Sequence, residues 1–197
     1  MKVAISRRAV RRLWRGSQIG LFAVAAAMLG YCAFVMTDTW IYQRHQSRML
    51  DLPYPRITTP MRPAVLVMGE LVGRIEIPRL GLAVIVAEGT DEATLRRAAG
   101  HIEGTALPGK SGNVGIAGHR DTLFRALRNI RQDDVITLTT LQGLYRYRVV
   151  STKVVSPYDV VVLSPNGQEI LTLVTCYPFY FVGAAPDRFI VRATRVL

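Results

Sequence analysis

Residues 170–175 read Ile-Leu-Thr-Leu-Val-Thr, and Cys176, Tyr177 and Pro178 follow them directly. A short run of apolar and β-branched residues is typical of a buried strand. The strand has to end near Pro178, because proline has no backbone N–H to donate to a neighbouring strand. Cys176 therefore lies where a rigid strand gives way to a loop, a position from which scaffolds present reactive groups. A packed, inert thiol is the alternative, since free cysteine is among the most buried residue types.

Similar short runs, separated by turn residues, extend on both sides of this stretch from about residue 72 onwards. The candidate strands are 73–77, 82–86, 113–117, 134–138, 145–155, 169–175 and 188–194. Glycine and proline signals such as Pro108-Gly109 punctuate them, and Thr90–Leu95 and Thr122–Ile130 are typical of short helices. Seven or eight strands with few helices predict a mainly β fold, a closed or nearly closed β-barrel.

The N-terminal part of the 197-residue chain is basic and then apolar. Residues 1–16 carry six basic side chains and no acid, more than half of the net charge of +11. The next segment, 19–36, has no charged residue and would span about 27 Å as a helix. This order predicts a single-pass transmembrane helix over 17–37 in the cell membrane, with a cytoplasmic arm before it and an extracytoplasmic domain after it. A cleaved signal peptide is the rival interpretation, although the apolar run is longer than is usual for one.

Composition divides the remaining chain into a linker and a folded domain. Residues 38–71 contain four prolines among polar residues, which predicts an extended stalk, and residues 72–197 are expected to form the barrel domain. The two cysteines lie in different parts, Cys32 in the apolar span and Cys176 in the domain, so no disulfide is expected between them. An unpaired thiol is unusual in an exported domain, which favours a reactive role for Cys176.

Two further residues carry chemistry at expected strand ends. His119 follows the strand 113–117 and shares a face with small residues, which lets another group approach its imidazole. Arg188 opens the last strand, where its guanidinium can stabilise an oxyanion. Each residue alone also fits a structural or surface role, but a thiol together with a histidine favours nucleophilic catalysis.

Taken together, Thr-Leu-Val-Thr-Cys176, Arg188 twelve residues later and Gly-His119-Arg 57 residues earlier resemble the motifs of the sortases, membrane-anchored cysteine transpeptidases of bacterial surfaces. The resemblance covers nearly all of residues 73–197. It implies a closed seven- to eight-stranded sortase-type β-barrel with Cys176 as nucleophile, His119 as general acid/base and Arg188 as transition-state stabiliser. The segment Tyr177-Pro178-Phe179 resembles class D sortases and related Gram-negative types.

The resemblance also implies a reaction and its partners. The enzyme would cleave a C-terminal LPxTG-like sorting signal of exported proteins through a thioacyl-enzyme, and pass the acyl group to an amine on a peptidoglycan precursor or a pilin. Residues 156–165 are expected to line the substrate groove. Two alternatives stay open: a membrane-anchored cysteine peptidase that uses water, and a non-catalytic anchored β-barrel adaptor. No nucleic-acid partner is expected, because membrane topology explains the arginine cluster.

Other polar residues are expected to have structural roles. His101 has no counterpart in the resemblance, and Asp121 is expected to cap the turn after His119 rather than to complete a triad. No cofactor is expected, since no histidine and cysteine cluster has zinc-ligand spacing. Calcium, which some sortases bind, is possible but not supported, because the acids that could hold it are scattered: Glu88, Asp91, Glu92 and Glu103.

Overall fold

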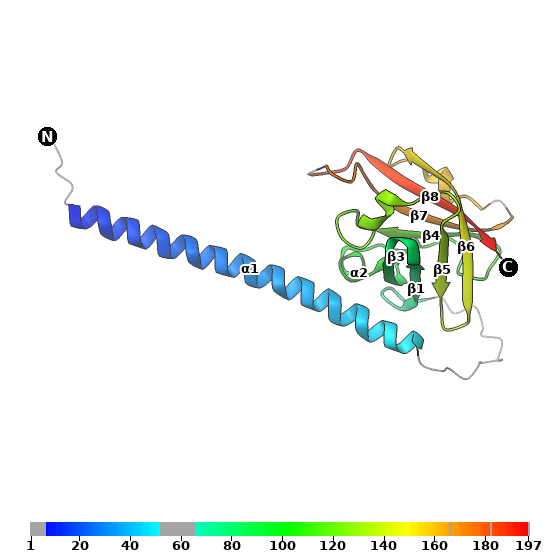
Figure 1. The fold of residues 1–197 in the computed structure, drawn as a ribbon, viewed down its shortest axis with the longest axis horizontal. Coiled ribbons are helices and arrows are strands. Elements are labelled where there is room, and N and C mark those ends of the chain that lie inside the picture. The colour runs from blue at the N-terminus through cyan, green and yellow to red at the C-terminus, as the bar shows by residue number, and fades with distance from the viewer. Residues whose placement is uncertain (1–6, 52–65, 166, 182, 197) are drawn as a thin grey trace. The chain divides into compact units, whose positions relative to one another are not determined.

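The computed structural model describes residues 7–51, 66–165, 167–181 and 183–196 (Figure 1). The chain divides into two compact units, Met1–Ile41 and Tyr42–Leu197. The helices are α1 (Arg7–Asp51), α2 (Glu92–Arg97) and three short 3-10 helices: η1 (Pro78–Leu80), η2 (Arg125–Asn129) and η3 (Val160–Leu163). The strands are β1 (Leu71–Ile77), β2 (Leu82–Glu88), β3 (Ala99–His101), β4 (Gly112–Gly118), β5 (Val135–Thr139), β6 (Leu144–Val155), β7 (Glu169–Tyr177) and β8 (Asp187–Val196).

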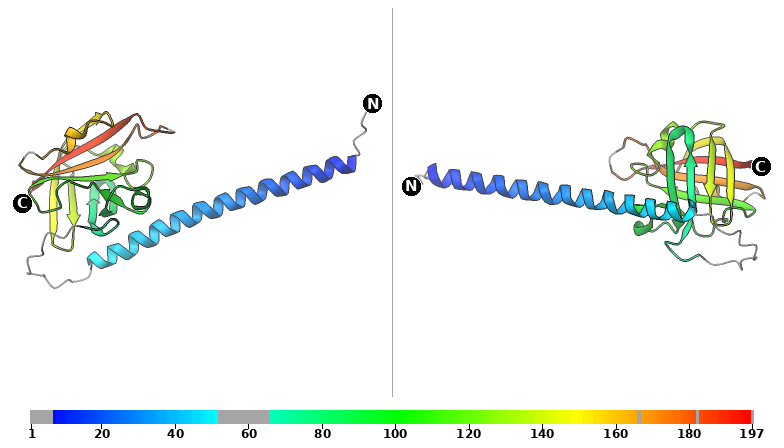
Figure 2. Two further views of the ribbon diagram at one scale, coloured as in Figure 1. Left: turned by 180° about the vertical axis from the view of Figure 1, so that it is seen from behind. Right: turned by 60° about the horizontal axis from the view of Figure 1, so that its bottom comes forward.

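The eight described strands close into one barrel in the order β1-β2-β3-β4-β7-β8-β6-β5. Most neighbours are antiparallel, but β2 pairs with β3 and β4 pairs with β7 in parallel. Figure 2 shows the barrel from two further sides, with β7 in orange and β8 in red running next to each other. The mainly β, closed-barrel prediction is confirmed.

One strand of the structure was not predicted, and both expected short helices are present. β3 was not expected, because three residues are too few to show an alternating pattern. The segment 122–130, expected to form a short helix, contains the 3-10 helix η2. The helix expected near residue 90 is present as α2, and the Asp91 side chain caps it by accepting the backbone N–H groups of Ala93 and Thr94.

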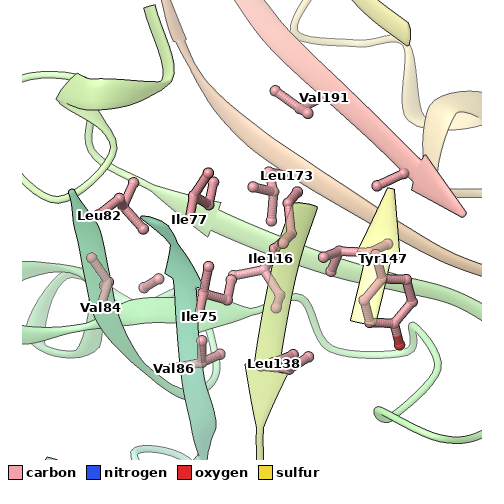
Figure 3. Packing of buried hydrophobic residues seen from close by; sticks show 14 of the residues in the cluster. Ile75, Ile77, Leu82, Val84, Val86, Ile116, Leu138, Tyr147, Leu173 and Val191 are labelled. Carbon is pink, nitrogen blue, oxygen red and sulfur yellow. The ribbon is translucent and has the colours of Figure 1, made fainter. Parts of the chain in front are cut away.

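The barrel is filled by one face of each long strand. Ile75, Ile116, Leu138 and Leu173 come from four different strands and are fully buried in the main core cluster. Figure 3 shows these side chains meeting from β1, β4, β5 and β7. Since side chains alternate along a strand, the residues between them lie on the outer face of the sheet.

Helix α1 is longer than the expected transmembrane segment. The described chain contains one helix, Trp14–Asp51, that is long and apolar enough to cross a membrane. It continues past residue 37 because neither proline nor glycine occurs between residues 31 and 51. The expected stalk over 38–71 is thus helical as far as Asp51, and its four prolines lie outside the described residues.

The last part of α1, from Tyr42 onwards, belongs to the same compact unit as the barrel. The Gln43 amide joins two elements there: Ile85 N–H of β2 donates to Gln43 Oε1 at 2.8 Å, and Gln43 Nε2 donates to Arg97 O at the end of α2 at 2.6 Å. A second, smaller apolar cluster consists of the buried residues Ile85, Ala87 and Ala98, against which the partly buried Tyr42, Leu50 and Leu71 pack. This segment therefore covers part of the outer surface of the barrel.

Candidate active site

The three residues expected to be catalytic lie at one end of three adjacent strands. In the parallel β4–β7 pair, Ala117 is opposite Val174 and Gly118 is opposite Thr175, so continuing the register by one residue brings His119 next to Cys176. In the antiparallel β7–β8 pair, Cys176 is directly opposite Arg188. Adjacent strands are about 4.8 Å apart, so the order His119–Cys176–Arg188 forms a short row across the sheet.

The three side chains also share a face. Ile116, Leu173 and Val191 point into the main core from β4, β7 and β8. His119, Cys176 and Arg188 are each an odd number of positions away from these residues, so strand alternation puts them on the outer face. His119 is exposed, and Cys176 and Arg188 are half-buried. The structure thus places a thiol between an imidazole and a guanidinium at a solvent-accessible edge.

A buried hydrogen bond fixes the strand ends that carry the thiol and the imidazole. Thr175 Oγ1 donates to Gly118 O at 2.7 Å, and Thr175 is only 2% exposed. These two residues directly precede Cys176 and His119. The bond therefore holds the two chain segments in register where the pairing of β4 with β7 ends.

The Arg188 guanidinium is held at the start of β8 by its own chain. Nη1 donates to Asp187 O at 3.0 Å and to Ala185 O at 3.4 Å. Ala185 belongs to the connection between β7 and β8, and Asp187 is the first residue of β8. Because guanidinium has five donors in a planar fork, these bonds fix the group while other N–H groups are available to bind a substrate oxygen.

Small and polar residues farther along β4 and β7 hold η3 over the outer face. Thr172 Oγ1 donates to Asn113 Oδ1 at 2.7 Å, and Asn113 Nδ2 donates to Val162 O at 3.0 Å. A Cβ at Gly115 would lie 3.0 Å from a methyl carbon of Leu163, so glycine allows η3 to approach closely. This packing positions part of the segment 156–165 that was expected to line the substrate groove.

A small pocket of about 160 Å³ lies between η3 and the strands β6 and β8. Val161 and Val162 line it from η3, and Ile190 lines it from β8. Ile190 is two residues beyond Arg188 on the same strand, so the pocket opens on the face that carries Cys176. The lining combines these apolar side chains with four polar ones: Ser151, Lys153, Asp159 and Arg192.

The other polar candidates have structural contacts. His101 is buried, and its Nδ1 lies 2.7 Å from Glu88 Oε2 while its Nε2 lies 3.0 Å from Ala106 O, in agreement with the expected structural role. The turn after His119 is closed by the backbone, with Phe124 N–H donating to His119 O at 3.0 Å. Asp121 was expected to cap this turn, and instead its carboxylate lies 3.6 Å from Arg120 Nε.

Two of the four acids considered for calcium are already engaged. Glu88 pairs with His101, and Asp91 caps α2. The hydrogen bond from the Thr94 hydroxyl lowers the pKa of Asp91 below its usual value. Among the residues that the structure describes, no three His, Cys, Asp or Glu side chains are grouped to hold a metal ion.

The described β-barrel matches a known family. Residues 75–196 match the model of the sortase domain, so the chain belongs to the sortase family. The family resemblance predicted from the sequence is confirmed.

Two relatives with curated names can be aligned with different shares of the chain. It is 36% identical to sortase D of Bacillus subtilis (strain 168) over 129 residues, which is 65% of each chain. It is 34% identical to sortase A of Listeria monocytogenes over 110 residues, 54% of this chain and 49% of that one. The chain therefore spans less than two thirds of either relative.

Solved structures of sortases share the fold. The Clostridium perfringens sortase D5 transpeptidase superposes with a TM-score of 0.67 at 29% identity, covering 82% of this chain and 98% of that one. Sortase A of Listeria monocytogenes superposes with a TM-score of 0.59 at 29% identity, covering 64% of this chain and 88% of that one.

Proposed function

We propose that this chain is a membrane-anchored cysteine transpeptidase that cleaves a C-terminal sorting signal of exported proteins and joins the new carboxyl end to an amine. The observation that carries the proposal is the strand register, which aligns His119, Cys176 and Arg188 on one outer face. Membership of the sortase family supports the same reaction, and a similar solved protein is described as a transpeptidase.

In the proposed reaction, the Cys176 sulfur attacks the carbonyl carbon of the scissile amide, and the C–N bond breaks to leave a thioester. His119 takes the thiol proton and gives it to the departing amine, and it later takes a proton from the incoming amine and returns it to the sulfur. Arg188 stabilises the negative charge on the carbonyl oxygen in both steps. The acceptor amine then attacks the thioester, which restores the thiol and forms a new amide without any redox partner.

The pocket beside Ile190 is proposed to receive an apolar side chain of the sorting signal. Val161, Val162 and Ile190 would contact such a group, polar residues line the rest of the pocket, and its volume of about 160 Å³ suits one side chain. By the family resemblance we propose an LPxTG-like signal, an acceptor amine on a peptidoglycan precursor or a pilin, and a class D-like type. The similarity to two class D relatives supports the last point.

The test uses the full-length chain in detergent with a labelled LPxTG-type peptide, with and without triglycine. Mass spectrometry should detect a ligated product and a thioester on the protein. Cys176→Ala and His119→Ala should abolish ligation, and Arg188→Lys should reduce it by about 100-fold, because one ammonium cannot replace the planar fork. Thioester formation by Cys176→Ala would refute the assignment of the nucleophile.

The same experiment separates the two alternatives. Hydrolysis at a rate that no amine changes would identify a peptidase. A thiol that iodoacetamide does not alkylate in the folded chain, together with an absence of cleavage, would identify a non-catalytic adaptor.

We further propose that α1 crosses the membrane once, with the N-terminus in the cytoplasm and the barrel outside. The supporting features are the long apolar helix and the arginines that precede it. An alkaline phosphatase fused after Leu197 should be active, since that enzyme needs an oxidising compartment. A second alkaline phosphatase is fused before Ile19 for comparison. If that fusion is active and the one after Leu197 is inactive, the orientation is opposite to the proposed one.

A further inference from the structure

The side chain after His119 is bonded to the loop after Cys176. Arg120 is only 5% exposed, although it lies in a turn at the end of β4. Its Nη1 donates to Pro178 O at 3.0 Å, and its Nη2 donates to Phe181 O at 2.8 Å and to Gly183 O at 2.9 Å. One guanidinium thus contacts three carbonyls of the connection between β7 and β8.

The surroundings of Arg120 explain why the group stays in this place. Burial of a guanidinium is unfavourable unless its donors are satisfied, so the loop carbonyls and the cation stabilise each other. The guanidinium carbon also lies 5.9 Å from the centre of the Phe181 ring, within cation–π range. The Asp121 carboxylate, 3.6 Å from Nε, adds an opposite charge at the exposed side.

A second arginine makes a weaker contact with the same loop. The Arg128 guanidinium of η2 lies 5.7 Å from the centre of the Tyr180 ring. Tyr180 is 79% exposed, so this contact is screened by water and contributes less than the buried one. The loop after Cys176 is therefore attached to the segment after His119 mainly through Arg120.

The position of Arg120 in the chain gives this attachment a consequence for the site. Arg120 is covalently next to His119, and its acceptors begin two residues after Cys176. The loop that it holds leads directly into Asp187 and Arg188, the start of β8. A shift of the loop would change the placement of the thiol and guanidinium relative to the imidazole.

We propose that Arg120 is a positioning residue, which seats the loop after Cys176 against the turn after His119 and so sets the alignment of the three reacting groups. The proposal rests on the proposed function for its catalytic consequence, but the loop attachment itself is testable without substrate. Misplacement of reacting groups by about 1 Å costs about 100-fold in rate. Loss of Arg120 should therefore lower kcat by about 10- to 100-fold while KM changes little.

The experiment compares Arg120→Ala and Arg120→Lys with Arg125→Ala in the full-length chain in detergent. Arg125 is an exposed arginine five residues further along, so its variant controls for the loss of one positive charge. Arg120→Ala should have a kcat far below that of the wild type. Arg120→Lys should have an intermediate kcat, because an ammonium can bond one or two of the carbonyls. Arg125→Ala should have the kcat of the wild type. Thermal unfolding shows whether each variant is folded. If Arg120→Ala does not fold, the kcat of Arg120→Lys tests the proposal in its place.

Two measurements decide the proposal even if the wild type ligates nothing. Hydrogen–deuterium exchange should be faster in peptides covering the loop after Cys176 for both Arg120 variants, and unchanged for Arg125→Ala. The rate at which iodoacetamide alkylates Cys176 should change when His119→Ala is introduced into the wild-type chain. The same substitution should change this rate less when it is introduced into the Arg120→Ala variant. An unchanged exchange rate, or an equal response to His119→Ala in both backgrounds, would overturn the positioning role without touching the proposed function.

Discussion

The contact between Gln43 and the barrel gives a prediction for stability. Gln43→Ala removes two hydrogen bonds and leaves Ile85 N–H, which belongs to a fully buried residue, without its acceptor. Each bond contributes about 0.5–1.5 kcal/mol, and an unsatisfied buried group costs about 1–3 kcal/mol. The free energy of unfolding should therefore fall by about 2 kcal/mol. For a domain of this size each kcal/mol lowers Tm by about 2–4 °C, so Tm should fall by about 4–8 °C.

Differential scanning calorimetry of the full-length chain in detergent measures this change directly. Gln43→Glu should lose less than Gln43→Ala, because its carboxylate still accepts from Ile85 N–H but cannot donate to Arg97 O. His45→Ala is the control, since His45 is exposed and lies about 200° around the helix from Gln43. A Tm for Gln43→Ala within about 1 °C of the His45→Ala value would refute the reasoning, because the amide would then contribute nothing.

Three further predictions concern the strand ends and one ion pair. Thr175→Val keeps the side-chain shape but removes the donor to Gly118 O, so unfolding free energy should fall by about 1–2 kcal/mol in a urea titration, and the ligation rate should fall with it. Gly118→Ala would place a methyl group 2.7 Å from the Phe124 ring, and the same titration should show a loss of about 1–3 kcal/mol; wild-type stability would contradict the packing. Hydrogen bonds from Arg79 lower the pKa of Asp134, so its stabilising contribution is complete above the ordinary value of about 4 and is lost as pH falls through the lowered pKa. Asp134→Asn should therefore flatten the decline of Tm below about pH 4, and an unchanged decline would count against the pair.

Much of the barrel could be predicted because its long strands carry a local pattern. The short apolar and β-branched run of β7 is visible in the sequence, and so is the proline that follows this strand. β3 could not be found, since its three residues are strand only because β2 and β4 pair with them. The extension of α1 to Asp51 was missed because the prolines after it suggested an extended chain for the whole segment.

The identity of the candidate site residues could be predicted, but their supporting contacts could not. The residue types and the family resemblance singled out Cys176, His119 and Arg188. The bond between Thr175 and Gly118, and those from Arg120 to the loop, depend on segments about 60 residues apart in the sequence. Arg120 was quoted as part of the histidine motif, yet nothing in one sequence indicates where a guanidinium will find its acceptors.

The parallel pairing of β4 with β7 sets the positions of the candidate catalytic residues independently of the turns between these two strands. The chain leaves β4 after Gly118 and begins β7 at Glu169, and the long excursion between these two strands builds η2, β5, β6 and η3. Insertions or deletions in the turns of that excursion would leave the register of the thiol and imidazole unchanged, because backbone pairing sets it. Evolution can therefore change the loops that recognise the substrate while the catalytic residues keep their arrangement.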